Sequence, residues 1–378
     1  MPNAMTTAGG TASGTNQGQA PAPVAVKSFV RSSLEHRESA GIDKTVQLSS
    51  SDQDLGAFPI PAYGFLRSLL LIVEVTGGAG TAVFGADAPW NLLKNIIIQE
   101  PNGATIAQFN SGYDLYLANK FGGYRGYNDP KARPDYSTNV TGGNAKFMLR
   151  IPLELRARDA LGAIPNQNAA AAFQLRATLS AATNIYTTSP TTLPNVRIRV
   201  VTEAWDQPAI SSDGTANQTT PPAMNTTQFW SKQSYQVSAG MNMIRHTRVG
   251  NYLRNLAFIY RDSTGARVSF ASNNFAAPAT IQYDTRPIDQ MHPEVWRNTM
   301  YERTGYGAAY DTAGGLDNGV WIYDFMHEFD GRLGNELNDG WLPTQSSTRL
   351  EIQGNFGVAG TLEVLTNDVS VAGNVFLS

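Results

Sequence analysis

The side chains that most often perform chemistry in proteins are few and scattered in this sequence. The four histidines are His36, His246, His292 and His327, and no two of them have the spacing of paired metal ligands. His327 is followed by Glu328, as in zinc proteases, but glycine stands where such a site needs its second histidine. Since the chain also has no cysteine, a disulfide framework and a thiolate metal site are excluded. We therefore expect no metal and no cofactor.

Carboxylates occur in close pairs, but nothing in the sequence selects one pair as a catalytic dyad. The pairs are Glu203 with Asp206, Asp284 with Asp289, Glu328 with Asp330, and Glu336 with Asp339. A glycosidase needs two carboxylates that face one bond, and loops of any large β-protein carry such residues by chance. No nucleophile elbow, phosphate-binding loop or dinucleotide-binding glycine motif is present. We therefore expect that the protein is not an enzyme. A glycosidase whose carboxylates lie on loops is the weaker alternative.

Aromatic residues gather in two stretches, residues 110–130 and 296–310, and we expect both to be loops. Clusters of tyrosine and arginine are typical of surfaces that bind protein partners. Stacking of these rings on sugars is the competing interpretation. It would make the chain a carbohydrate-binding β-sandwich, such as a receptor-binding spike.

The composition points to a protein whose surface is covered by neighbours. Of the 378 residues only 16% are charged, against roughly 25% in typical soluble chains, and the formal net charge is −3. Low charge suits surfaces that are buried in assembly, because unpaired buried charges are costly. The lack of a basic excess argues against specific nucleic-acid binding. Frequent glycine and proline, 35 and 20 residues, indicate many short strands joined by turns.

The N-terminal forty residues differ from the rest of the chain. Residues 1–23 contain almost no large apolar side chain, which predicts a flexible arm. Residues 24–38 place apolar side chains at helical spacing, which predicts a short amphipathic helix. This helix could dock on its own domain, on a partner subunit or on a membrane surface. The candidates for an inner, membrane-facing surface are Lys27, Phe29, Val30, Arg31, Leu34 and Arg37.

No segment has the features of a membrane span or a secretory signal. The longest strongly apolar run, residues 65–75, contains two charges and is far shorter than the roughly 20 residues that cross a bilayer. The N-terminus lacks a basic start followed by an apolar stretch. We expect the protein to stay in the cell that makes it.

From Thr45 onward, short apolar runs bounded by turn residues predict an all-β protein in two domains. Residues 91–109 read as a hairpin around Pro101, Asn102 and Gly103. A stretch rich in proline, serine and threonine marks a linker. The expected division is an arm and helix at 1–40, a first domain at 41–210, a linker at 211–228 and a second domain at 229–378.

The second half of the chain repeats the pattern of the first. Residues 234–238 match residues 45–49, and residues 252–260 match residues 65–73, with offsets of 189 and 187. Three later strands and one turn then follow in the same order: 319–325 on 146–152, 340–345 on 162–167, 349–354 on the strand around 174–179, and 361–369 on 196–204. Matches in one order predict two copies of a single β-sandwich.

The strand sequence resembles the double jelly-roll major capsid proteins of tectiviruses, tailless bacterial viruses with a membrane inside an icosahedral shell. Residues 88–103 resemble the first-domain strand and turn of that family. In the second half, residues 252–265, 283–305 and 318–325 resemble in order a strand with a glycine turn, an Asp-Thr-Arg element with a helix starting at Pro293, and a strand around Trp321.

The resemblance implies two tandem eight-stranded jelly-roll β-sandwiches in each chain. It further implies homotrimers with six similar domains, which tile with neighbouring trimers, vertex proteins and minor capsid proteins around an internal membrane vesicle. Assembly would take place in the cytoplasm of a bacterial host. The internal repeat supports this picture, since six similar domains from three chains require two per chain.

Overall fold

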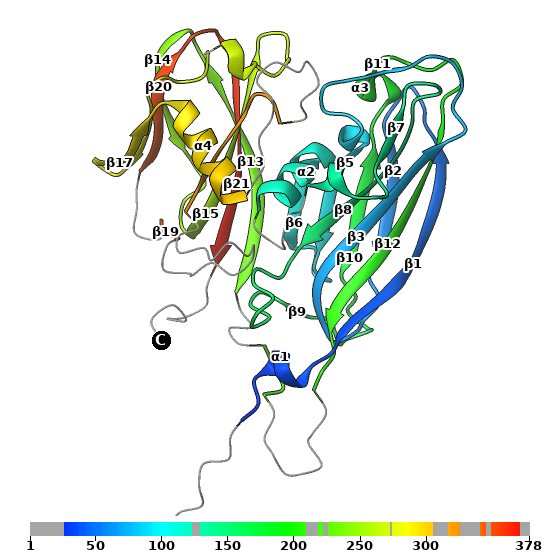
Figure 1. Ribbon diagram of the computed structural model, residues 1–378. Helices are drawn as coiled ribbons and strands as arrows, with labels where there is room; N and C mark the ends of the chain where they lie inside the picture. Colours follow the sequence, from blue (N-terminus) through cyan, green and yellow to red (C-terminus); the bar gives the residue numbers. More distant parts are fainter. Residues whose placement is uncertain are drawn as a thin grey trace, which may run out of the picture.

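The computed structural model describes residues 26–122, 129–208, 218–221, 226–272, 274–304, 317–325, 341–344 and 349–370. In this part of the chain two antiparallel β-sandwiches stand side by side, with their strands running in the same general direction (Figure 1). The first described residues and a short helix lie beneath the first sandwich.

Two sheets form the first sandwich. Sheet A has the order β1 (Glu35–Gln47), β12 (Asn195–Trp205), β3 (Phe65–Thr76), β8 (Asn144–Pro152) and β7 (Ser137–Asn139). Sheet B has the order β2 (Gln53–Pro59), β10 (Gln174–Leu179), β5 (Leu93–Gln99) and β6 (Thr105–Ser111). The short strand β9 (Ile164–Pro165) pairs with β3, and β4 (Val83–Phe84) pairs with β11 (Tyr186–Thr188).

The second sandwich is built in the same way. Sheet C has the order β13 (Thr227–Val237), β21 (Gly360–Ser370), β15 (Tyr252–Asp262) and β18 (Val320–Asp324), and β19 (Leu342–Pro343) pairs with β15. Sheet D has the order β14 (Gly240–His246), β20 (Leu350–Phe356), β16 (Ala279–Tyr283) and β17 (Arg286–Met291).

The two sandwiches share one topology. If the eight long strands of each are numbered along the chain, one sheet has the order 1-8-3-6 and the other 2-7-4-5 in both cases. This is the eight-stranded jelly roll. The prediction of an all-β chain with two tandem eight-stranded jelly rolls is confirmed.

Alternating side chains explain why these segments form half-buried strands. In β3, Leu69, Leu71 and Val73 point into the first core, while Leu70 and Ile72 point to the other face and stay partly exposed. The hairpin predicted between β5 and β6 is present. Gly103 in its turn has a φ of 89°, a conformation that glycine adopts without strain.

The internal repeat is visible residue by residue. Leu66 of β3 pairs with Ile164 of β9, and Leu253 of β15 pairs with Leu342 of β19. Pairing also corrects the sequence alignment: Ile72 pairs with Met148 and Ile259 with Val320, so that β8 and β18 align one residue away from the predicted match. The strands correspond as predicted, and some registers shift.

Two helices occupy the aromatic stretches that were expected to be loops, and the second begins at Pro293 as the resemblance implied. Helix α2 (Gly112–Phe121) follows β6, and α4 (Pro293–Thr304) follows β17 at the equivalent place in the second jelly roll. Ser111 caps α2, because its hydroxyl accepts a hydrogen bond from the Tyr113 amide while Asp114 accepts one from the Ser111 amide. All ten residues of α2 are buried, so its sequence shows no polar stripe that would reveal a helix.

The predicted N-terminal helix is much shorter than expected. Helix α1 covers only Phe29–Ser32, and the chain then enters β1 at Glu35, opposite Trp205 in β12. Residues with helical spacing therefore continue as an edge strand, because the backbone of β12 offers a ladder of partners. The first jelly roll thus begins at Glu35 rather than at residue 41. Residues 1–25 and most of the predicted linker lie outside the described residues.

Candidate assembly site

The largest apolar contact outside the two cores joins the two jelly rolls. The outward face of sheet C presents Ala257, Ile259, Val320 and Leu365, which are buried and belong to the same apolar cluster as the core of the first jelly roll. They cover the β6–α2 region, which we define as β6 together with α2. Figure 1 shows α2 on the side of the first jelly roll that faces the second.

A chain of alternating charges accompanies this apolar contact. Asp114 of α2 lies 3.0 Å from the ammonium group of Lys232, which lies 3.7 Å from Glu363. Glu363 in turn contacts Arg261 at 3.0 Å, and Arg261 contacts Asp87 of the first jelly roll at 2.7 Å. Burial acts to lower the pKa of Lys232, but Asp114 and Glu363 outweigh it and raise the pKa above its usual value. Opposite charges from the two jelly rolls therefore fix their register.

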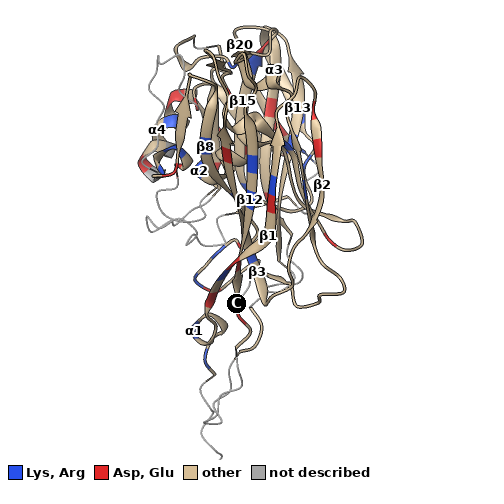
Figure 2. Cartoon of the chain, turned by 90° about the vertical axis from the view of Figure 1, so that its right-hand side faces the viewer, with Lys and Arg blue, Asp and Glu red and all other residues tan. Residues whose placement is uncertain are grey.

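The same face of the first jelly roll is uncovered. Strand pairing aligns Leu70 with Ala257, Ile72 with Ile259, Met148 with Val320 and Val201 with Leu365. In sheet A all four side chains are partly exposed, whereas in sheet C all four are buried. Charged residues of both signs lie along β1 and β12 of the same sheet (Figure 2). Sheet A thus has an apolar stripe like that of sheet C, and none of the residues that the structure describes covers it.

The opposite end of the molecule is uncovered as well. We define the β17–α4 region as β17 together with α4, the counterpart of the buried β6–α2 region. It exposes Ile288, Met291, Val295 and Tyr301, while Trp296 on the same helix is buried in its own core. Four of the large apolar side chains that the described residues expose thus lie in one region. The described residues thus expose, at the two ends of the molecule, the counterparts of the two surfaces that meet between the jelly rolls.

The predicted membrane-facing residues of the N-terminal segment differ in whether they are buried against the first jelly roll or exposed. Phe29 is buried against Phe65 and Trp205, with ring centroids 5.2 and 6.4 Å away, and Val30 packs on the same cluster. Arg37 lies in β1 and donates a hydrogen bond to Glu203 at 2.8 Å.

Lys27, Arg31, Leu34 and Arg37 are exposed, and Leu34 keeps 72% of its surface. Val26 beside them, which was not among the predicted residues, is also exposed. Four of the six predicted residues are therefore exposed, and the other two, Phe29 and Val30, pack on the first jelly roll.

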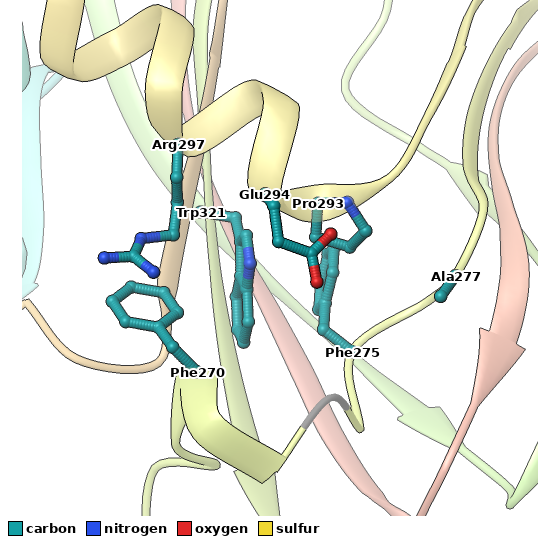
Figure 3. Close-up of a pocket in the computed structure, with 7 residues that line it drawn as sticks. All are labelled: Phe270, Phe275, Ala277, Pro293, Glu294, Arg297 and Trp321. Carbon is teal, nitrogen blue, oxygen red and sulfur yellow. The ribbon is translucent and has the colours of Figure 1, made fainter. Parts of the chain in front are cut away.

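A pocket beside α4 does not have the form of a ligand site. Phe270, Phe275 and Trp321 line it, with Glu294 and Arg297 at its mouth (Figure 3). The rings of Phe275 and Trp321 stack on each other with centroids 4.1 Å apart, and Arg297 lies over Phe270. The free volume is about 20 Å³, room for about one water molecule. No ring face is therefore open for a sugar in this pocket.

The other residues considered for chemistry have structural contacts. Glu203 is buried and paired with arginines, Asp284 accepts a hydrogen bond from the Arg349 amide, and Asp289 accepts one from the Trp296 indole. Glu328, Asp330, Glu336, Asp339 and His327 lie outside the described residues. Across the described part of the chain, histidines and carboxylates form no group of three that could hold a metal ion. No described helix is long and apolar enough to cross a membrane.

Solved structures with the same arrangement are viral capsid proteins. The major capsid protein of Sulfolobus turreted icosahedral virus has a TM-score of 0.63 and 13% identity, covering 91% of this chain and 99% of its own. That of bacteriophage PM2 has a TM-score of 0.53 and 9% identity, with coverage of 90% and 99%. The capsid of the virus PBCV-1 contributes a chain with a TM-score of 0.56 and 9% identity, with coverage of 89% and 93%.

This chain has the double jelly-roll fold. The alignments cover nearly the whole of each capsid protein, so both jelly rolls and their relative placement are shared. No family model matches the sequence, and no curated protein matches it either. The resemblance to double jelly-roll capsid proteins is confirmed in the fold, while sequence identity is too low to carry over individual residues.

Proposed function

We propose that this protein is the major capsid protein of an icosahedral virus and that it forms trimeric, pseudo-hexameric capsomers. The observation that carries the proposal is the uncovered half-interface at each end of the chain. Sheet A offers the apolar stripe that sheet C uses within the chain, and the β17–α4 region is the counterpart of the covered β6–α2 region.

Repeating the internal contact between chains builds a ring. Sheet A of one chain covers the β17–α4 region of the next, just as sheet C covers β6–α2. Such head-to-tail contacts close into a ring when the rotation between units allows it. Three chains supply six jelly rolls and leave no half-interface open. The solved capsid proteins of the same fold support this role.

Electron microscopy of the purified chain tests the proposal. We expect particles with a six-sided outline and three-fold symmetry, and similar units in rows on the shells of the virus that encodes the chain. Two-lobed single molecules at micromolar concentration, or absence of the protein from the shell lattice, would contradict it.

We further propose that the lower end faces a membrane inside the shell. Val26 and Leu34 expose apolar surface next to the cations Lys27 and Arg31, a combination that suits an anionic membrane surface. Phe29 is buried and holds this segment in place, while Arg37 is exposed and bonds to Glu203. Minor capsid proteins and assembly in a bacterial cytoplasm belong to the same proposal.

Vesicle binding separates the two groups of residues. The variant K27E/R31E should lose at least tenfold in affinity for anionic vesicles, because each basic residue near such a surface contributes about 1 kcal/mol. The matched control K131E/R176E changes the same number of exposed charges on the first jelly roll and should bind as the wild type does. Equal binding by both variants would refute membrane contact at this end.

A further inference from the structure

Strand β14 carries two methionines on a surface that the proposed trimer leaves uncovered. Met241 and Met243 are two residues apart, so their side chains share one face of sheet D. They keep 73% and 60% of their surface exposed, and Met241 is the most exposed large apolar residue among those described. We call Met241 and Met243 the methionine strip.

The trimer contact does not reach this strip. In sheet D the order is β14-β20-β16-β17, so β14 and β17 form opposite edges. In the first jelly roll, β2 occupies the place of β14, and its residues Asp54 and Ala57 stay exposed although the second jelly roll covers β6 at the other edge. Figure 1 shows β14 on the side of the second jelly roll away from the first.

The side chains beside the two methionines are uncharged, and charged residues, Arg245, Glu351 and its ion-pair partner Arg349, lie only at the end of the strip. Met241 lies opposite Asn355 and Met243 opposite Gln353, and Thr280 follows on the next strand. At the end of the strip Arg245 lies opposite Glu351, so that opposite charges face each other. An uncharged apolar surface can meet an identical copy of itself across a two-fold axis without placing like charges together.

We propose that the methionine strip is the contact between neighbouring trimers, with the strip of a second copy as its occupant. This inference rests on the proposed function and adds the surface by which capsomers join. Identical trimers in a curved shell meet at several slightly different angles. Methionine suits such contacts because its unbranched, flexible side chain adapts to different neighbours. Strand β2 exposes no large apolar residue, so the first jelly roll offers no second strip.

The absence of cysteine in the sequence allows a direct test. In the variant M243C, trimers at high concentration should react with a short bismaleimide to give chains of twice 40.8 kDa, and dilution to isolated trimers should abolish the product. The control V83C places its thiol at another exposed position and should give little product. In parallel, the variant M241K/M243K should form normal trimers whose association into larger assemblies falls at least tenfold in mass photometry.

The inference fails if wild-type trimers stay apart at every concentration, if M241K/M243K trimers associate as the wild type does, or if M243C and V83C crosslink equally. Each of these results would leave trimer formation intact. A chain that forms no trimer in any variant would instead count against the proposed function, so the two failures are distinguishable.

Discussion

The two jelly rolls have the same strand order but differ in which surfaces the chain itself covers. In the first, all of α2 is buried, between its own jelly roll and the side of the second that carries Lys232. In the second, α4 exposes Val295 and Tyr301, and nothing described in the chain covers them. The contrast is what the proposed ring requires, namely one complete interface within the chain and the two halves of another at its ends. Under that proposal, duplication of the domain gives the chain both surfaces by which copies join.

The strongest test of this comparison introduces the same charge at two equivalent positions. Ala257→Asp buries a carboxylate without a partner between the jelly rolls, which should cost more than about 4 kcal/mol and leave little soluble protein. Leu70→Asp affects a partly exposed position, so the monomer should lose less than about 1 kcal/mol in free energy of unfolding while trimers disappear. Soluble yield, urea denaturation and mass photometry measure these effects. Equal loss of folding in both variants would show that sheet A is not a free interface.

Mixing variants sharpens the comparison further. Leu70→Asp leaves the β17–α4 region intact, and Val295→Asp leaves sheet A intact. Each variant alone should be monomeric, whereas their mixture should form dimers of twice 40.8 kDa that cannot close into a ring. Mass photometry distinguishes the monomers from the dimers by their mass. Dimers in either variant alone would mean that another surface joins the chains.

A smaller effect is expected from the charges that fix the register of the jelly rolls. Lys232→Met removes the cation next to buried Asp114 and should lower the free energy of unfolding by about 3–5 kcal/mol. The double variant D114N/K232M should recover part of this loss. Strand pairing aligns Ser39 of β1 with Lys232. Because Ser39 is exposed, the substitution Ser39→Met should lower the free energy of unfolding by less than about 0.5 kcal/mol in a urea titration. A similar cost at both positions would remove the distinction between covered and free faces.

Acid should weaken the second jelly roll more than the first. His246 is buried, with Tyr235 and Thr366 at its two ring nitrogens, and burial together with Arg248 lowers its pKa to about 4. As the pH falls from about 6.5 to about 4, His246 therefore binds a proton in the unfolded chain but not in the folded one. The free energy of unfolding decreases over that range. Between about pH 7 and 4.5 the loss should be about 2.5 kcal/mol larger in the wild type than in H246Q, measured by urea denaturation. Equal losses would show that His246 titrates freely.

The fold was predictable because its signals are local, whereas the helices and interfaces depend on the tertiary structure. Alternation in β3 and the turn at Gly103 identify strands from a few residues each. The helix α2 was missed because burial on all sides removes the polar stripe that marks a helix in a sequence. The N-terminal helix was predicted too long, since spacing cannot show that β12 offers Glu35 a strand partner.

The candidate assembly surfaces could not be predicted, for a related reason. Leu70 and Ala257 are both apolar residues at alternate positions of a strand, and the sequence does not indicate that one is covered and the other free. Of the residues predicted to face a membrane, Lys27, Arg31, Leu34 and Arg37 are exposed, and their contact with a membrane stays a prediction. The prediction missed that Phe29 is an anchor, because Phe65 and Trp205 that bury it lie far away in the sequence.

The mass of the purified chain at micromolar concentration, measured beside the variant Leu70→Asp, tests the central claim most directly. The account predicts a wild-type particle of three times 40.8 kDa and a folded variant of 40.8 kDa. A wild type that stays monomeric, or a trimer that survives the substitution, would contradict the claim that sheet A and the β17–α4 region are two halves of one interface.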